Sequence, residues 1–153
     1  MGNIFDCELE TVDYVDLKRY LGKWYEIAKI PSFFERGGQN TFAFYSSLSN
    51  GFISVTNQTE ENGKIQSISG TAYPVDPSGS KLKVDFGLPS GPADYWIIRL
   101  DPNYTWAVVS NPDRDHLWIL SRSKYMNENL YQSILESICD DIDISRIVKT
   151  PQF

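Results

Sequence analysis

The side chains best suited to catalysis or metal binding are few in this sequence. His116 is its single histidine, and Cys7 and Cys139 are its two cysteines. A nucleophilic cysteine needs an activating base, and His116 is the one imidazole that could serve. The sequence has no G-x-S-x-G motif, no nucleotide-binding loop and no paired Cys or His pattern for a metal. We therefore expect a protein that is not an enzyme and has no metal or other cofactor. A lipid-modifying enzyme and haem ligation by His116 are the alternatives.

The two cysteines lie near opposite ends of the chain. They can form a disulfide only if the two ends meet. With no sign of an oxidising compartment, reduced thiols are the better expectation. Cys139 also lies beside the apolar stripe of a predicted helix, which favours a buried thiol with a structural role.

Short alternating runs of apolar and aromatic residues dominate the middle of the chain and are separated by turn residues. This rhythm is typical of an antiparallel meander. The predicted strands are 24–30, 41–47, 51–58, 65–73, 81–86, 95–100, 105–110 and 117–121. The connections carry Asn, Gly, Pro and Asp, as short hairpin turns require. We therefore predict an all-β fold, an eight-stranded antiparallel up-and-down β-barrel, because closure removes exposed strand edges.

One helix is predicted after the strands. Asn127 is a suitable N-cap, and Leu130, Ile134 and Ile138 recur at helical spacing, so this C-terminal helix should pack on the outside of the barrel. A shorter helical segment at 13–21 could plug one end. The length favours a single domain, and we assign residues 1–14 to an N-terminal extension and residues 15–153 to the barrel.

Strand alternation predicts which side chains line the interior. An eight-stranded barrel has room for packed side chains or one small ligand, and Trp24 at the start of the first strand is a natural seal for one end. The same alternation turns Glu26 and Ala28 inward. The predicted ligand-binding residues are Ala43, Tyr45, Ile53, Val55, Asn57, Ile68, Val84, Phe86, Trp96, Ile98, Val109, His116 and Trp118. This mostly apolar lining suits an acyl chain or a flat hydrophobe, with Tyr45, Asn57 and His116 as polar partners for a headgroup.

The segment after the first strand is predicted to be a loop across the mouth of the barrel. Its Phe33 and Phe34 are too apolar for solvent unless they cover a ligand or contact a partner. The partner could be a membrane surface or a second copy of the chain in a homodimer. A protein that binds a membrane or itself through these mouth loops is the alternative to one that holds a ligand inside the barrel. The formal net charge of -6 argues against nucleic acid as a partner.

The sequence also bears on location. The start MGNIFDCELE lacks the basic and apolar regions of a secretion signal, and no apolar run reaches the ~20 residues of a membrane span. We expect a cytoplasmic or peripheral membrane protein, with an outer-membrane lipoprotein or a secreted protein as the alternative if a signal has been removed.

Several stretches resemble one known family. The run Gly22-Lys23-Trp24-Tyr25 resembles the G-x-W-Y signature of the lipocalins, and the stretch DYWIIRLDPNYTWAVVSNPDRDHLWILSR and the tail DISRIVKTPQ are similar to bacterial, animal and plant members. Asp94-Tyr95 resembles the second family signature, around the turn between the sixth and seventh strands. Arg122 resembles the third. The resemblance covers nearly the whole chain from Val15 onward.

The resemblance implies a lipocalin barrel in which Arg122 stacks on Trp24 and helps to close one end. It further implies binding and transport or storage of a small hydrophobic ligand, which we expect to be of the fatty acid or lysophospholipid class. The bacterial members are usually lipoproteins, but the residues NIFDC that end at Cys7 depart from their lipidation signal.

Overall fold

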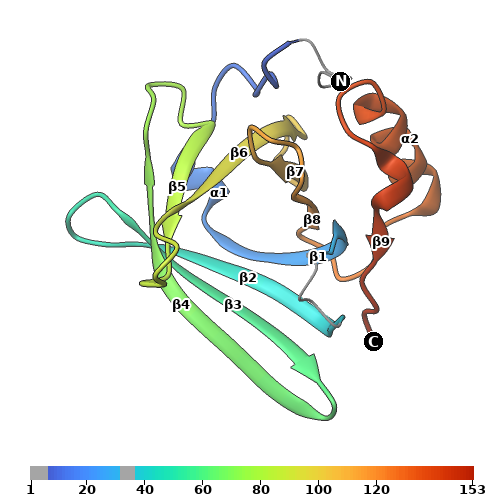
Figure 1. Ribbon diagram of the computed structural model, residues 1–153, viewed down its shortest axis with the longest axis horizontal. Coiled ribbons are helices and arrows are strands. Elements are labelled where there is room, and N and C mark those ends of the chain that lie inside the picture. Colours follow the sequence, from blue (N-terminus) through green and yellow to red (C-terminus); the bar gives the residue numbers. More distant parts are fainter. Residues whose placement is uncertain (1–6, 32–36) are drawn as a thin grey trace.

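A closed barrel of antiparallel strands forms the body of the protein in a computed structural model, which describes residues 7–31 and 37–153 (Figure 1). The described strands are β1 Gly22–Ile30, β2 Gln39–Ser47, β3 Ile53–Glu61, β4 Lys64–Pro74, β5 Lys81–Asp85, β6 Ala93–Leu100, β7 Trp106–Ser110, β8 Leu117–Ser121 and β9 Val148–Lys149. The described helices are α1 Leu17–Tyr20, α2 Glu128–Ile138 and the short 3-10 helix η1 Ile144–Arg146.

The barrel closes through β1. The strands from β2 to β8 pair in chain order, and β8 pairs with β1. The first part of β1 also pairs with β2, with Gly22 opposite Tyr45 and Tyr25 opposite Phe42. The predicted eight-stranded barrel is therefore confirmed. The additional strand β9 pairs with β1 at Ala28 and Lys29, where β2 no longer pairs with it.

A β-bulge in β1 changes which side chains face the interior. The pairing with β8 shifts between Glu26, opposite Leu120, and Ala28, opposite Ile119. One extra residue in a strand inverts the alternation beyond it. Glu26 and Lys29 consequently face the cavity, whereas Ile27 and Ala28 both pack on the outside. The prediction that Ala28 faces inward is wrong for this reason.

Strand β6 faces the opposite way from the prediction. Tyr95 is paired with Leu82 of β5, and directly opposed residues share one face of a sheet. Tyr95 and Ile97 therefore belong to the interior, while Trp96 and Ile98 pack in the outer cluster. The assignment of Trp96 and Ile98 to the ligand lining is thus wrong.

Two apolar clusters result, one inside the barrel and one between the barrel and α2. Trp24, Val55 and Val109 are among the buried residues of the inner cluster. The outer cluster contains Ile134 and Ile138 of α2. As predicted, Asn127 caps α2, because its side-chain oxygen accepts hydrogen bonds from the backbone N–H groups of residues 129 and 130. Figure 1 shows α2 lying against the outside of the barrel.

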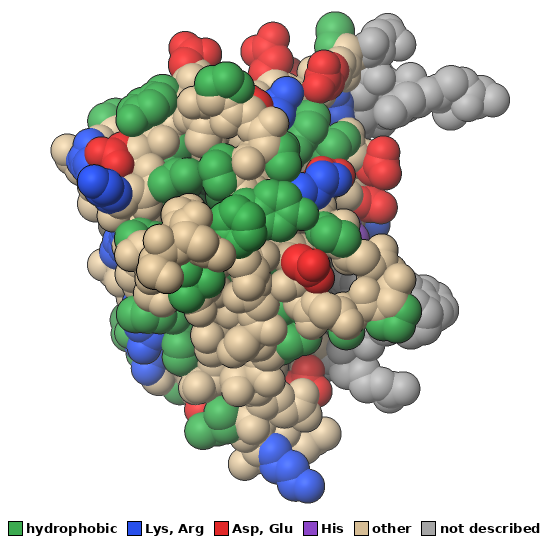
Figure 2. All heavy atoms as spheres, turned by 90° about the vertical axis from the view of Figure 1, so that its left-hand side faces the viewer, with side chains coloured by type: hydrophobic (Ala, Val, Ile, Leu, Met, Phe, Trp, Pro, Cys, Tyr) green, Lys and Arg blue, Asp and Glu red, His purple; other side chains and the backbone are tan. Residues whose placement is uncertain are grey.

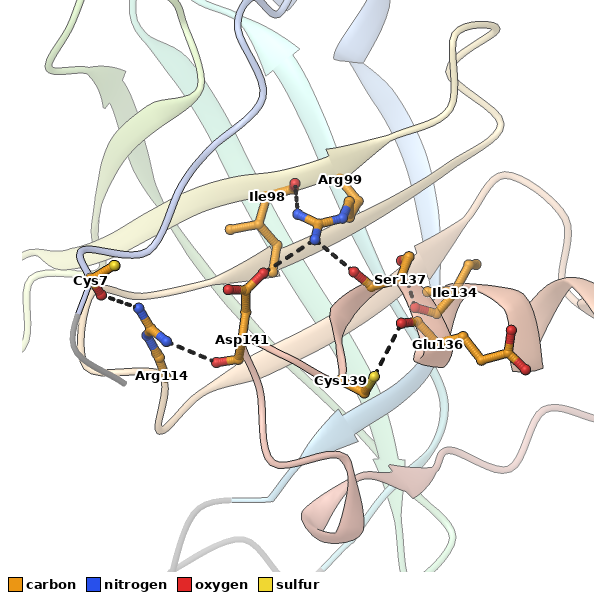
Figure 3. A network of polar contacts seen from close by, with 9 residues as sticks. All are labelled: Cys7, Ile98, Arg99, Arg114, Ile134, Glu136, Ser137, Cys139 and Asp141. Atoms are coloured by element: carbon orange, nitrogen blue, oxygen red, sulfur yellow. Dashed lines mark hydrogen bonds and ion pairs between the residues drawn. The ribbon is translucent and has the colours of Figure 1, made fainter. Parts of the chain in front are cut away.

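Two arginines of the barrel hold the C-terminal end of α2, whose own last turn has no basic residue (Figure 3). Arg99 donates to the Ser137 carbonyl at 2.7 Å and contacts the Asp141 carboxylate at 3.2 Å. Arg114 donates to the carbonyls of Asp141 and Cys7 and so links the N-terminal segment to the same point. Cations are favoured at a helix C-terminus, where carbonyl groups lack intrahelical partners.

Cys139 departs from the prediction of a buried thiol. It is the C-cap of α2, lies beyond the last buried position of the helix, and is exposed. Its thiol donates to the Glu136 carbonyl at 3.2 Å. Cys7 is exposed as well, and both are free thiols.

The dipeptide Asp94-Tyr95 lies at the start of β6 and pairs with β5, so its predicted place in the turn between β6 and β7 is wrong. That turn instead contains Asp101, whose carboxylate accepts hydrogen bonds from the backbone N–H and hydroxyl groups of Thr105.

Candidate ligand-binding site

The end of the barrel where β1 begins is closed by stacked side chains. Trp24 is fully buried, and its indole N–H donates to the Tyr20 carbonyl at 2.8 Å. The Arg122 guanidinium lies 3.8 Å from the centroid of the Trp24 ring. Arg122 also donates to the carbonyls of Tyr104, Lys23 and Arg19 at 3.2, 3.0 and 2.8 Å. One side chain thus fastens the indole, the β6–β7 turn and the segment around α1 together.

Above this plug lies a cavity of about 390 Å³. Its volume falls within the ~300–1,000 Å³ of typical small-molecule pockets. Gln66, Ser67 and Ile68 line it and are exposed, so the cavity opens beside the β3–β4 hairpin. The side opposite Trp24 is therefore the entrance.

Only some of the predicted residues line the cavity. Those that line the cavity are Ala43, Tyr45, Val55, Asn57, Ile68, Val84, Phe86 and Trp118. Ile53 and Val109 belong to the inner cluster but do not line the cavity. His116 does not line it either; its half-buried ring stacks on Trp118, with centroids 5.7 Å apart and planes 10° apart. Phe33 and Phe34, predicted to form a mouth loop, lie outside the described residues.

The base of the cavity carries a chain of three phenols. The Tyr95 hydroxyl lies 2.8 Å from the Tyr20 hydroxyl and 2.8 Å from the Tyr45 hydroxyl. Tyr45 and Tyr95 line the cavity, and Tyr20 packs beside Trp24, with ring centroids 4.9 Å apart. Burial raises the pKa of Tyr45 to about 12 and raises the pKa values of Tyr20 and Tyr95 well above their ordinary value. All three hydroxyl groups are therefore neutral at physiological pH.

Charged side chains lie farther along β1, toward the entrance. The buried Glu26 carboxylate accepts a hydrogen bond from the Thr150 hydroxyl at 2.6 Å, and the Lys29 ammonium lies 4.0 Å from it. The carbonyls of Glu26 and Thr41 both accept from the Gln152 side-chain amide. The C-terminal segment therefore fixes one wall of the cavity.

The sequence missed part of this lining. Glu26 was predicted to face inward, and Leu120 lies on the same face as the predicted Trp118. The lining residues that were missed are Lys29, Thr41, Phe42, Gln58, Thr59, Glu61, Gln66, Ser67, Ala93, Asp94 and Tyr95. Tyr95 could have been found from its pairing with Leu82, which is two residues from the predicted lining residue Val84 and so shares its face of β5. Lys29 could not have been found in the sequence, because the alternation of apolar and polar residues carries no sign of a bulge.

Two further observations concern the described residues. None of their helices is long and apolar enough to cross a membrane. Nor do their His, Cys, Asp and Glu side chains gather in a group of three or more that could hold a metal ion.

A barrel sealed by tryptophan and arginine at one end and hollow at the other defines a carrier-type barrel of the lipocalin class. The lipocalin-like domain family matches residues 15–152, and the chain belongs to this family. It is 41% identical to temperature-induced lipocalin-1 of Arabidopsis thaliana, over 95% of this chain and 83% of that protein. It is 38% identical to the outer membrane lipoprotein Blc of Escherichia coli K12, over 93% and 82%.

A solved structure shows the same fold. Insecticyanin from the tobacco hornworm Manduca sexta superposes with a TM-score of 0.77 at 24% identity, over 95% of this chain and 85% of that one. Membership of the lipocalin family supports the binding and transport of small hydrophobic ligands as the general class of function.

Proposed function

We propose that this protein binds a fatty acid or lysophospholipid in the barrel cavity and transports or stores it. The carrier unit is residues 15–153, with residues 1–14 as an extension. The acyl chain occupies the space bounded by Val55, Val84 and Leu120, and the headgroup remains at the entrance, within reach of Lys29 and Asn57.

The apolar, one-ended cavity is the observation that supports this proposal. Val55, Val84 and Leu120 are buried side chains on three different strands that face the same space. Transfer of each methylene from water to such a site contributes about 0.8 kcal/mol before ordering costs are subtracted. A single acyl chain therefore has enough apolar surface to bind tightly.

Displacement of a fluorescent fatty acid tests the proposal. We expect saturable binding to the wild-type protein and competition by hexadecanoic acid and by lysophosphatidylcholine. Val84→Trp should fill the cavity and abolish binding, whereas Val148→Trp, at an exposed position on β9, should leave it unchanged. Unaltered binding by a folded Val84→Trp variant would place the ligand outside the barrel.

A second candidate function is contact with a membrane surface or with another copy of the chain. Hydrophobic side chains gather on the outer face shown in Figure 2, and Leu48, Phe52 and Val75 are exposed by 40 to 50%. The Phe52 ring lies 5.4 Å from that of Tyr73, so these two aromatic side chains share one apolar surface.

Vesicle flotation and light scattering test this second candidate. We expect Leu48→Ser/Phe52→Ser to lose flotation with phosphatidylcholine vesicles, or to lose self-association, while keeping fatty acid binding. Tyr125→Ser, at another exposed position, is the control. A wild-type protein that is monomeric and does not float would eliminate this candidate and leave the carrier function intact.

A further inference from the structure

We propose that the base of the cavity binds a neutral oxygen acceptor, a carbonyl or hydroxyl group at the buried end of the ligand. This inference rests on the proposed carrier function and specifies which hydrophobic ligands the cavity selects. Its basis is the hydrogen-bond chain formed by Tyr20, Tyr95 and Tyr45.

The three tyrosine hydroxyl groups have one more proton than the hydrogen bonds between them use. Three phenol groups carry three hydroxyl protons, and each hydrogen bond between them uses one. The structure has two such contacts, both at 2.8 Å and both involving Tyr95. Among the described residues, no other group is hydrogen-bonded to these hydroxyls. Whichever way the two bonds run, one proton remains to be donated.

The spare proton belongs to a site that a ligand can reach. Tyr45 and Tyr95 contribute to the cavity wall, and Tyr20 lies beneath them in contact with Trp24. Rotation of the hydroxyl groups can bring the spare proton to either of the two wall tyrosines. The surrounding wall is apolar, with Val55, Val84 and Leu120.

A ligand that fills the base keeps water away from this donor. If the ligand ends in a methyl group, the buried donor has no acceptor, which is costly because no side chain among the described residues accepts a hydrogen bond from these hydroxyls apart from the tyrosines themselves. If it ends in a carbonyl or hydroxyl oxygen, the hydrogen bond is restored. The base of the cavity therefore discriminates in favour of an oxygen at the leading end of the ligand.

The acceptor is expected to be neutral. The charged residues among the described lining are Lys29 and three carboxylates, Glu26, Glu61 and Asp94. Lys29 is near the end of β1 remote from Gly22, and Arg122 lies behind the Trp24 ring. An ionised carboxylate at the base would lose its water without direct contact with a cation. A fatty acid carboxylate therefore remains at the entrance, and the far end of its chain reaches the tyrosines.

Matched lipids and matched variants test the inference. Hexadecanoic acid and 16-hydroxyhexadecanoic acid are titrated against the wild-type protein and Tyr45→Phe/Tyr95→Phe, with shorter and longer homologous pairs to match the cavity depth. Tyr14→Phe/Tyr125→Phe removes two hydroxyl groups from exposed tyrosines as the control. For each protein we divide the dissociation constant of hexadecanoic acid by that of 16-hydroxyhexadecanoic acid. We expect this ratio to be about tenfold higher for the wild-type protein and the control than for Tyr45→Phe/Tyr95→Phe.

The outcomes separate this inference from the carrier function. Equal ratios in all three proteins would overturn the inference while leaving the carrier function supported. No saturable binding of either lipid to the wild-type protein would overturn both. Binding of hexadecanoic acid by Tyr45→Phe/Tyr95→Phe shows that this variant is folded.

A second test compares two isomeric hydroxy fatty acids on the wild-type protein. 9-Hydroxyhexadecanoic acid places its hydroxyl group against the apolar wall, so it should bind about tenfold more weakly than the 16-hydroxy isomer. Equal affinity of the two isomers would contradict the inference.

Discussion

The Arg122 guanidinium covers the Trp24 ring at 3.8 Å and at the same time donates hydrogen bonds to three backbone carbonyls. Those carbonyls belong to Arg19 in α1, Lys23 at the start of β1 and Tyr104 in the turn between β6 and β7. A planar group with a fork of N–H donors can satisfy them while stacking on an indole, and an ammonium group cannot. Closure of the barrel therefore depends on the shape of this side chain as well as on its charge.

Arg122→Ala should lower the free energy of unfolding by about 2 to 4 kcal/mol, because it removes the cation-π contact and leaves carbonyls without their donor. Arg122→Lys should recover less than half of the loss. Urea denaturation followed by tryptophan fluorescence measures both. Arg146→Ala, at an exposed arginine of η1, is the control. Full stability of Arg122→Lys would show that charge alone suffices.

Gly22→Ala should destabilise the protein through contact with the same arginine. Gly22 has φ +102°, and a Cβ there would lie 3.1 Å from Nη1 of Arg122. Gly51→Ala is the matched control, because Gly51 has φ +84° and nothing within 4 Å of a Cβ. We expect a loss of about 1 kcal/mol for Gly51→Ala and about 2 to 3 kcal/mol for Gly22→Ala in thermal unfolding. Equal losses would mean that backbone strain alone determines the cost.

The order of the strands could be predicted from the sequence because each barrel strand has its own alternating run and its own turn residues. α2 could be predicted for a similar reason, since Asn127 and the apolar spacing after it are local signals. Cys139 was misplaced because α2 ends one residue earlier, so the thiol lies at the helix end rather than on its apolar stripe.

The candidate site was harder to predict because it depends on register. The bulge after Glu26 sends Lys29 into the cavity, and nothing in the alternation reveals an extra residue. The phenol chain joins Tyr20, Tyr45 and Tyr95 from α1, β2 and β6. Only the paired strands and the packing of α1 bring these three side chains together, so no local pattern could identify them.

Thr150→Val should weaken the attachment of the C-terminal segment to the cavity wall. The Thr150 hydroxyl donates to the buried Glu26 carboxylate at 2.6 Å, and valine keeps the shape without the donor. We expect a loss of about 1 to 3 kcal/mol in urea denaturation. Thr56→Val, which removes an exposed hydroxyl contact to Ser69, should change stability by less than about 0.5 kcal/mol. A similar small change for Thr150→Val would show that the carboxylate does not depend on this donor.

Tyr45 should make the barrel sensitive to alkaline pH. Burial raises its pKa from 10.0 to about 12 in the folded protein, so the unfolded chain releases this proton at lower pH than the native state does. Its contribution to stability is complete below about pH 10 and is lost as the pH rises through about 12. At about 1.4 kcal/mol per pKa unit, the wild-type protein should lose about 2 to 3 kcal/mol more than Tyr45→Phe between about pH 9 and pH 12. Urea denaturation at successive pH values measures the difference, with Tyr14→Phe, at an exposed tyrosine, expected to follow the wild-type curve. Parallel curves for the wild-type protein and Tyr45→Phe would show that this hydroxyl titrates alike in the folded and unfolded states.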